Sequence, residues 1–506
     1  MIAALPFGPG GLAFISLYLL SLLALGWWGR KAQKADTLQD FYLAGPGVGF
    51  AVLLLTLYAT QWSGNTLFGY TGKAYNVGFN WLISLHFMTA LVICYLFFAP
   101  WLHRLAKRHG FITPADFLLH RFNSRPLCLL AVIVMLIGVT NYLLAQIIAM
   151  GTATEVLLTY GVEDSAIAPR TAFIGGVILL AAIMLIYETL GGFRAVAWTD
   201  AIQGVILILG FMLLLGMVIH QYGTPSDAVA KLIKTAPEKI EPPTGIRHTL
   251  NWISWIIIVG FGGALYPQAI QRIYAARNAL TLRRSLAVMV FLPLTTTVVV
   301  LLVGIIASAN GLEVKQSIHL LPAICREVMQ TPTGYWLVVI LSAAILAGLM
   351  STADSVLLVI SAMITKDIYA RHFNPAATES QLTRLGKWIS VAIVLLTASL
   401  AIAFYGHRDS NILITLLKIK FEMLLQLAPA FILGIHYPSL RPGPVLAGMA
   451  TGLAVALGLF LQRKFGTNPI DTHGLHEGVI GLAANLIVLG GVTWLRGMHS
   501  TPAQAK

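Results

Sequence analysis

The sequence has few charged residues: Asp, Glu, Lys and Arg together make up 10% of its 506 residues. Soluble domains carry about 25%. Hydrophobic residues make up 57%, and the mean hydropathy is +0.80. These values exclude a soluble enzyme or a soluble binding module. Apolar runs of about 20 residues recur along the chain, and each is long enough to cross a bilayer as a helix. The sequence therefore predicts a polytopic helical membrane protein whose first partner is the lipid bilayer.

Cysteine is also scarce. Cys94, Cys128 and Cys325 lie far apart, and no CxxC pair occurs. This spacing argues against a metal site built from cysteines and against a disulfide framework. The sequence has no Walker A pattern either, so the energy for any pumping must come from an ion gradient. We expect a single membrane domain over residues 1–506 with no soluble appendage.

The formal net charge of +13 comes mostly from Lys and Arg in the segments between apolar runs. Dense clusters occupy residues 30–34, 104–125, 272–284 and 366–387. Excess basic charge on the cytoplasmic side is the usual pattern of membrane proteins, so we expect no nucleic-acid partner. The same bias predicts a multi-pass protein of the cell (inner) membrane, with the N-terminus outside and the C-terminus in the cytoplasm.

The apolar runs predict about thirteen transmembrane helices and no strands. They divide into one extra N-terminal helix, a first set of five over 48–220, a second set of five over 249–435, and two extra C-terminal helices over 444–496. The predicted spans are 9–29, 48–72, 81–102, 126–158, 171–189, 198–220, 249–269, 285–310, 334–364, 387–406, 412–435, 444–462 and 476–496.

Two of these spans contain residues that interrupt helices. Residues 58–72 read YATQWSGNTLFGYTG, and residues 260–272 read GFGGALYPQAIQR. Glycine and proline leave backbone groups without helical hydrogen bonds. A membrane protein tolerates such groups only where they line a cavity. The two segments lie near the start of the two sets of five spans. Since five is odd, the second set runs in the opposite sense, and paired broken helices of this kind indicate a transporter binding site.

A third span carries a polar stripe. Residues 349–361 read LMSTADSVLLVIS, so Ser351, Thr352, Asp354 and Ser355 lie inside an apolar segment. A carboxylate at the bilayer centre costs about 2.5–3.5 kcal/mol, so it needs an interior role. Small residues, hydroxyls and one carboxylate on a helix face suit a hard cation such as sodium. The alternative is that the hydroxyls bond to the preceding turn or pack between helices.

The longest distinctive words of the chain are GGFRAVAWTDAIQG at residues 191–204 and AGLMSTADSVLLVIS at residues 347–361, followed by TKDIY at 365–369. QRIYAARN at 271–278 and LAPAFILGIHYP at 427–438 accompany them. Over nearly its whole length the chain resembles the sodium:solute symporter family. The resemblance implies an all-α fold with the five-plus-five inverted repeat of the LeuT type, in which some members have thirteen spans.

The resemblance also implies ion ligands. One sodium would lie between the broken first core helix and the polar stripe, bound by Ala59, Trp62, Gly348, Ser351 and Thr352. Some members hold a second sodium, for which the matching positions are Asp200, Ser351, Asp354 and Ser355. The alternative to an ion ligand is a buried ion pair for Asp354. For Asp200 it is a structural role in which it fixes a loop with Arg194. Within the span 412–435, Lys418 and Glu422 are spaced for a salt bridge.

In such proteins the solute lies beside the two broken helices. The corresponding positions are Gln61, Ser63, Asn65, Tyr142, Gln146, Phe261, Tyr266 and Gln268. The proline carriers have an aspartate where this chain has Gln61. This difference argues against a proline-like solute.

These observations predict a sodium-coupled symporter that imports a small organic solute by alternating access, and one copy of the chain suffices for this mechanism. A monocarboxylate is preferred because the pocket positions offer amides and hydroxyls but no acid to pair an amine. An amino acid or pantothenate is the nearest alternative. Coupling to protons through Asp200 and Asp354, a solute sensor of the same fold and a membrane-embedded enzyme are the others.

Overall fold

A computed structural model describes residues 7–45, 47–63, 65–159, 167–314, 316–407, 412–466 and 470–498. The described chain is helical and contains no strand, only an isolated parallel bridge between Val48 and Ala276. The predicted fold class is therefore confirmed. Within the described ranges, nine helices are long and apolar enough to cross a membrane, or ten if one bent pair counts as a span. The count of thirteen stays a prediction.

The first half of the chain forms the elements that carry the first predicted repeat. They are α1 (Pro9–Lys31), α2 (Leu38–Leu43), α3 (Phe50–Gln61), η1 (Asn65–Tyr70), α4 (Thr71–Val77), η2 (Gly78–Leu82), α5 (Ile83–Cys94), η3 (Tyr95–Phe97), α6 (Ala99–His109), α7 (Pro114–Phe122), α8 (Arg125–Thr159) and α9 (Pro169–Tyr222).

The second half contains the short helices between residues 221 and 248, the second predicted repeat and the C-terminal pair. Its elements are α10 (Pro225–Thr235), η4 (Pro237–Lys239), α11 (Ile246–Ala264), α12 (Pro267–Ala275), α13 (Ala279–Met289), α14 (Leu292–Ala309), η5 (Ser317–His319), α15 (Leu320–Val328), α16 (Pro332–Ala362), η6 (Met363–Phe373), α17 (Glu379–Ala403), η7 (Phe404–His407), α18 (Ile412–Leu425), η8 (Pro429–Leu433), α19 (Gly434–His436), α20 (Pro442–Phe465) and α21 (Glu477–Met498).

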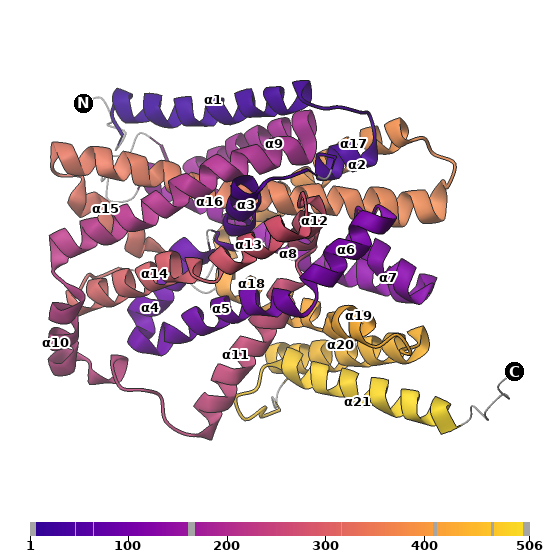
Figure 1. Ribbon diagram of the computed structural model, residues 1–506. Helices are drawn as coiled ribbons and strands as arrows, with labels where there is room; N and C mark the ends of the chain where they lie inside the picture. Colours follow the sequence, from indigo (N-terminus) through magenta and orange to yellow (C-terminus); the bar gives the residue numbers. More distant parts are fainter. Residues whose placement is uncertain are drawn as a thin grey trace, which may run out of the picture.

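Helix α16 lies at the centre of the bundle, with α1 along one flank and the α20–α21 pair along the opposite one (Figure 1). Thr331 caps its first turn by accepting from the Gly334 N–H at 3.0 Å, and Pro332 occupies the first helical position. Every residue from 341 to 363 is buried. Although a helix enclosed on all sides is normally apolar all round, α16 carries a polar stripe. Because these residues are buried, the stripe faces other helices and not lipid.

Both predicted breaks are present. Helix α3 ends at Gln61, Trp62 has extended backbone angles (φ −105°, ψ 118°), and the chain resumes in the π-helical turn η1. Helix α11 ends at Ala264, and α12 begins at Pro267 with a bend of 48°. Proline cannot donate to the helical ladder, so α12 starts afresh at that residue. Each break leaves backbone groups free inside the bundle.

Two predicted spans, 171–189 and 198–220, run together as α9. The interruption between them is a single residue, Gly192, at φ 55° and ψ −147°. A Cβ at this position would lie 2.4 Å from the carbonyl oxygen of Phe41, so only glycine fits both the backbone angles and the close approach to α2. The kink sets the direction in which the second half of α9 crosses the bundle.

Candidate functional site

The break after α3 lies against the polar stripe of α16. The hydroxyls of Ser351 and Thr352 are each 3.2 Å from the carbonyl oxygen of Ala59, and 3.4 and 3.3 Å from that of Gly348. All four residues are buried. Two carbonyl and two hydroxyl oxygens from two helices thus converge, which is the donor set that a hard monovalent cation prefers.

The end of α3 explains why the Ala59 carbonyl is free for this role. In a continuous helix it would accept the N–H of Ser63. Because the helix ends at Gln61, that N–H points to the hydroxyl of Thr66, 3.5 Å away. Trp62, the fifth predicted ligand, lies at the break itself, and its ring packs on Tyr58 with centroids 4.7 Å apart. Four of the five predicted sodium ligands therefore meet in space.

The residues predicted for a second sodium also meet, but a cation that the prediction missed lies among them. Arg272 of α12 donates from Nη2 to the Asp200 carboxylate at 2.8 Å and to the hydroxyl of Ser355. Its Nε donates to Thr56 at 2.8 Å. The Arg272 and Asp200 side chains are both fully buried. Placing Arg272 in a cytoplasmic basic cluster was wrong, because it lies inside the bundle.

Asp354 completes this group from α16. It accepts from the hydroxyl of Tyr187 at 2.7 Å and from that of Ser355 at 3.2 Å. Asp200 Oδ1 has no hydrogen-bond partner among the described residues. The group thus contains two buried carboxylates and one guanidinium. The alternative pairing of Asp200 with Arg194 was wrong, since Arg194 binds Asp40 at 2.9 Å.

Two of the predicted solute residues, Tyr142 of α8 and Tyr266 at the start of α12, meet in the buried interior. The rings of Tyr142 and Tyr266 stack with centroids 5.6 Å apart. The phenol of Tyr142 interacts with the hydroxyls of Ser63 and Thr352, which links this region to the predicted sodium ligands. Gln61 donates to the hydroxyl of Tyr95 at 2.6 Å.

Two other predicted solute residues, Gln146 and Gln268, are fully buried, and neither side-chain amide has a hydrogen-bond partner in the described structure. Buried amides are normally satisfied, so unpaired ones point to a ligand or to water. Phe261 is only half-buried, and its ring centroid lies 6.2 Å from that of Phe97. The side chain of Asn65 lies outside the described part of the structure.

One residue of this region was not predicted. Lys420 of α18 is fully buried, and its Nζ lies 3.1 Å from the ring centroid of Tyr142 and 4.6 Å from that of Tyr266. The predicted bridge between Lys418 and Glu422 is present at 3.4 Å, on a different side of the same helix. The signal that could have found Lys420 was its charge inside the predicted span 412–435, since only Lys418 has an acid at helical spacing, Glu422.

Comparison with known proteins identifies the family of the chain. The model of the sodium:solute symporter family matches residues 41–452. The chain belongs to the sodium:solute symporter family. Its role is therefore transport and not enzymatic catalysis, with sodium as the coupling ion of the family. The match includes both broken helices, the stripe of α16 and Lys420.

Among its family relatives, the sodium/pantothenate symporter of Escherichia coli (strain K12) is 26% identical over 448 residues, covering 87% of this chain and 89% of that protein. The sodium/proline symporter of Salmonella typhimurium is 25% identical over 482 residues, covering 93% and 91%. A solved structure of a Na⁺-coupled sialic acid symporter superposes with a TM-score of 0.78 at 20% identity, covering 97% and 98%. The last comparison shows that the symporter fold is shared.

A charged cluster outside the spans ties α7 to η6. Asp116 accepts from Lys366 at 2.5 Å and from Arg371, and Arg371 also pairs with Asp367 at 3.1 Å. Burial alone would raise the pKa of Asp116, but the two cations outweigh it and hold the pKa below its ordinary value. The carboxylate is therefore ionised at neutral pH.

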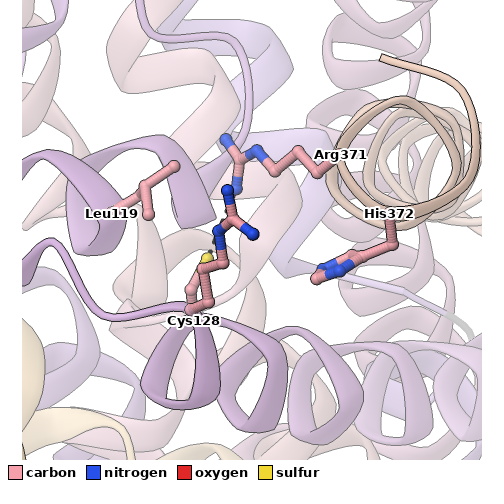
Figure 2. A pocket seen from close by; sticks show the side chains of 5 residues that line it. Leu119, Cys128, Arg371 and His372 are labelled. Carbon is pink, nitrogen blue, oxygen red and sulfur yellow. Dashed lines mark hydrogen bonds between the residues drawn. The ribbon is translucent and has the colours of Figure 1, made fainter.

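A cavity of about 140 Å³ adjoins this cluster. Figure 2 shows Arg371 reaching across it to the sulfur of Cys128 on α8, at 3.3 Å, with His372 beside it. The guanidinium thus links η6 to α7 and α8 at once. Since η6 continues directly from α16, the cluster fixes one end of the helix that carries the predicted sodium ligands.

Proposed function

We propose that this symporter uses the sodium gradient to import a small monocarboxylate by alternating access. The observation that carries the proposal is the convergence of the Ala59 and Gly348 carbonyls with the hydroxyls of Ser351 and Thr352. These oxygens belong to the broken helix α3 and to α16. A sodium ion bound by them, with the carbonyl of Trp62 as a further ligand, would hold the two helices together. Release of sodium would let them separate.

A second sodium fits the group formed by Asp200, Asp354 and Ser355, with Ser351 one turn away. Two carboxylates and one guanidinium leave one negative charge uncompensated in a dry site, which is unfavourable. One further monovalent cation would balance it. We therefore keep Asp200, Asp354 and Ser355 as ligands of a second sodium, with Arg272 as the other counter-charge. A proton on Asp354 would balance the same charge, and sodium-free, proton-driven uptake would indicate it.

The choice of a carboxylate rests on two supports. The solutes named for the relatives, which are pantothenate, proline and sialic acid, all carry a carboxylate group. The predicted solute residues Gln61, Ser63, Asn65, Tyr142, Gln146, Tyr266 and Gln268 include no acid that would pair an amine. A solute without an amine fits them best. An amino acid or pantothenate shares the carboxylate and is the alternative solute. Phe261, which is half-buried, is proposed as a further solute contact.

We further propose an inner-membrane orientation with the N-terminus outside and the C-terminus in the cytoplasm, as the distribution of basic residues indicates. The two predicted repeats, 48–220 and 249–435, then cross the membrane in opposite senses. All proposed ligands come from one chain, so a monomer suffices for transport.

Uptake by purified protein in proteoliposomes tests this function. With an inward sodium gradient we expect accumulation of at least one labelled monocarboxylate from a panel of acetate, propionate, lactate and pyruvate, and no accumulation when potassium replaces sodium. If two sodium ions enter with each monocarboxylate, one net positive charge moves, and a membrane potential of 100 mV then adds about 2.3 kcal/mol to the driving force. Sodium-dependent binding without uptake would instead identify a sensor. Uptake abolished by a protonophore and unaffected by sodium would contradict sodium coupling.

A further inference from the structure

Helix α18 carries two lysines in very different surroundings. Lys418 is paired with Glu477 at 2.8 Å and with Glu422 at 3.4 Å, and Arg463 supplies a second cation to Glu477 at 2.6 Å. Lys420 lies two residues further, roughly on the opposite side of the helix. It is fully buried, and its Nζ has neither a hydrogen-bond acceptor nor an acid within ion-pair distance among the described residues.

Aromatic rings surround the ammonium group instead. Its distances to the ring centroids are 3.1 Å for Tyr142, 4.6 Å for Tyr266 and 4.6 Å for Phe421. Tyr266 stacks between the other two rings, 5.6 Å from Tyr142 and 5.4 Å from Phe421. Ring faces attract a cation, but they do not replace the hydrogen bonds that three N–H groups lose on leaving water. The ammonium therefore retains capacity for an anion.

The chain is built to bring Lys420 to the broken helix. A Cβ on Gly262 of α11 would lie 2.6 Å from the carbonyl oxygen of Phe421. Glycine at this position lets α18 approach α11 closely, just before the break that places Tyr266 beside the lysine. Asn141 of α8 donates to the Leu416 carbonyl at 2.8 Å, so this hydrogen bond also holds α18 against α8, the helix of Tyr142.

Polar groups without partners lie on the same elements. Gln146 follows Tyr142 by one helical turn on α8, and Gln268 follows Tyr266 by two residues on α12; both amides are fully buried and unpaired in the described structure. Tyr142 also interacts with Thr352, one of the proposed sodium ligands. An anion at Lys420 would therefore be one side chain away from the ion site.

We propose that the ammonium of Lys420 binds the carboxylate of the transported solute. This inference rests on the function proposed above and names the group that selects its substrate class. One buried cation without a counter-ion matches one carboxylate, whereas a dicarboxylate would bring a second, uncompensated charge. A neutral analogue would leave the lysine unpaired, so the site should reject it strongly. The unpaired amides of Gln146 and Gln268 would then bind the remainder of the solute.

Matched pairs of ligands test this assignment whichever monocarboxylate is the natural solute. The probes are acetate, propionate, lactate, pyruvate and pantothenate, each compared with its neutral amide. Thermal unfolding of the purified protein is followed at neutral pH, without sodium and at saturating sodium. For the wild type we expect stabilisation by at least one carboxylate and roughly 100-fold weaker binding of its amide. The reason is that an interaction with a charged partner changes the affinity by about two factors of ten.

The lysine variants then locate the effect. Lys420→Met should lower carboxylate affinity to that of the amide, so the preference for the charged ligand disappears, while Lys420→Arg should retain part of it. Lys231→Met, at an exposed lysine that binds Asn310, is the matched control and should keep the full preference. Loss of the preference is a readout that a purely structural role of Lys420 would not produce.

The outcomes separate this inference from the proposed function. If the wild type binds carboxylates and their amides equally, or if Lys420→Met keeps the preference, the assignment is overturned while sodium coupling stands. The same holds if sodium stabilises the protein but none of the carboxylates binds. Absence of any sodium effect on the wild type would contradict the proposed function instead. Should Lys420→Met not yield folded protein, the comparison on the wild type and on Lys420→Arg still decides.

Discussion

Replacing Ser351 and Thr352 together by alanine is expected to raise the sodium concentration for half-maximal uptake by roughly 100-fold. A hydrogen-bonding group that contacts a charge contributes about 1.5–3 kcal/mol, and two such hydroxyls are lost. At 1.4 kcal/mol for each factor of ten, even the lower value for both gives about two orders of magnitude. The measurement is the sodium dependence of solute uptake in proteoliposomes, at equal amounts of reconstituted protein.

Ser342 provides the matched control on the same helix. It is buried in α16, but its hydroxyl bonds to the Val338 carbonyl at 2.8 Å, one turn earlier and away from the break in α3. Ser342→Ala should leave the sodium dependence unchanged. If the double variant behaves like this control, Ser351 and Thr352 only satisfy their own helix, and the sodium assignment fails.

Replacing Arg272 by methionine is expected to destabilise the protein strongly. The substitution leaves the fully buried Asp200 without its cation and takes a donor from Thr56 and Ser355. Removing one partner of a buried ion pair costs about 3–5 kcal/mol. The expected result is a large fall in the unfolding temperature in detergent, measured without solute and at fixed sodium.

A second substitution separates the charge effect from lost packing. Adding Asp200→Asn to Arg272→Met removes the unpaired carboxylate and should recover part of the loss. Arg247→Met is the control, because its pair with Asp471 is 64% and 49% exposed and is worth no more than about 1 kcal/mol. A double variant as unstable as the sum of its two single variants would show that Asp200 and Arg272 do not act as a pair.

The breaks in α3 and α11 could be predicted from sequence because their causes are local. The polar, glycine-containing sequence of residues 58–72 predicts one break and Pro267 predicts the other, so a short window of sequence contains the signal. The polar stripe of α16 is equally local, since helical spacing alone puts Ser351, Thr352 and Ser355 on one face. Local patterns thus sufficed to predict the two breaks and the polar face of α16.

Arg272 and Lys420 were missed for the opposite reason. Arg272 lies three residues beyond the predicted span 249–269, where a basic residue is ordinarily solvated. Lys420 lies inside the predicted span 412–435, but the adjacent Lys418–Glu422 pair accounted for the charges of that span. Their burial depends on distant elements: Arg272 is enclosed by Thr56, Asp200 and Ser355 from three other helices. No pattern within one span records such contacts. The merging of two predicted spans into α9 has a similar cause. The interruption between them is the single residue Gly192, which contacts Phe41 of the distant helix α2.

The central claim is that sodium at the α3 break and solute beside it bind as a coupled pair. Titration calorimetry on the purified protein tests this with sodium and with the carboxylate that the uptake panel identifies. Saturating carboxylate is expected to strengthen sodium binding by some factor, roughly 5- to 150-fold, and saturating sodium is expected to strengthen carboxylate binding by the same factor. Sodium and carboxylate affinities that do not depend on each other would contradict this coupling.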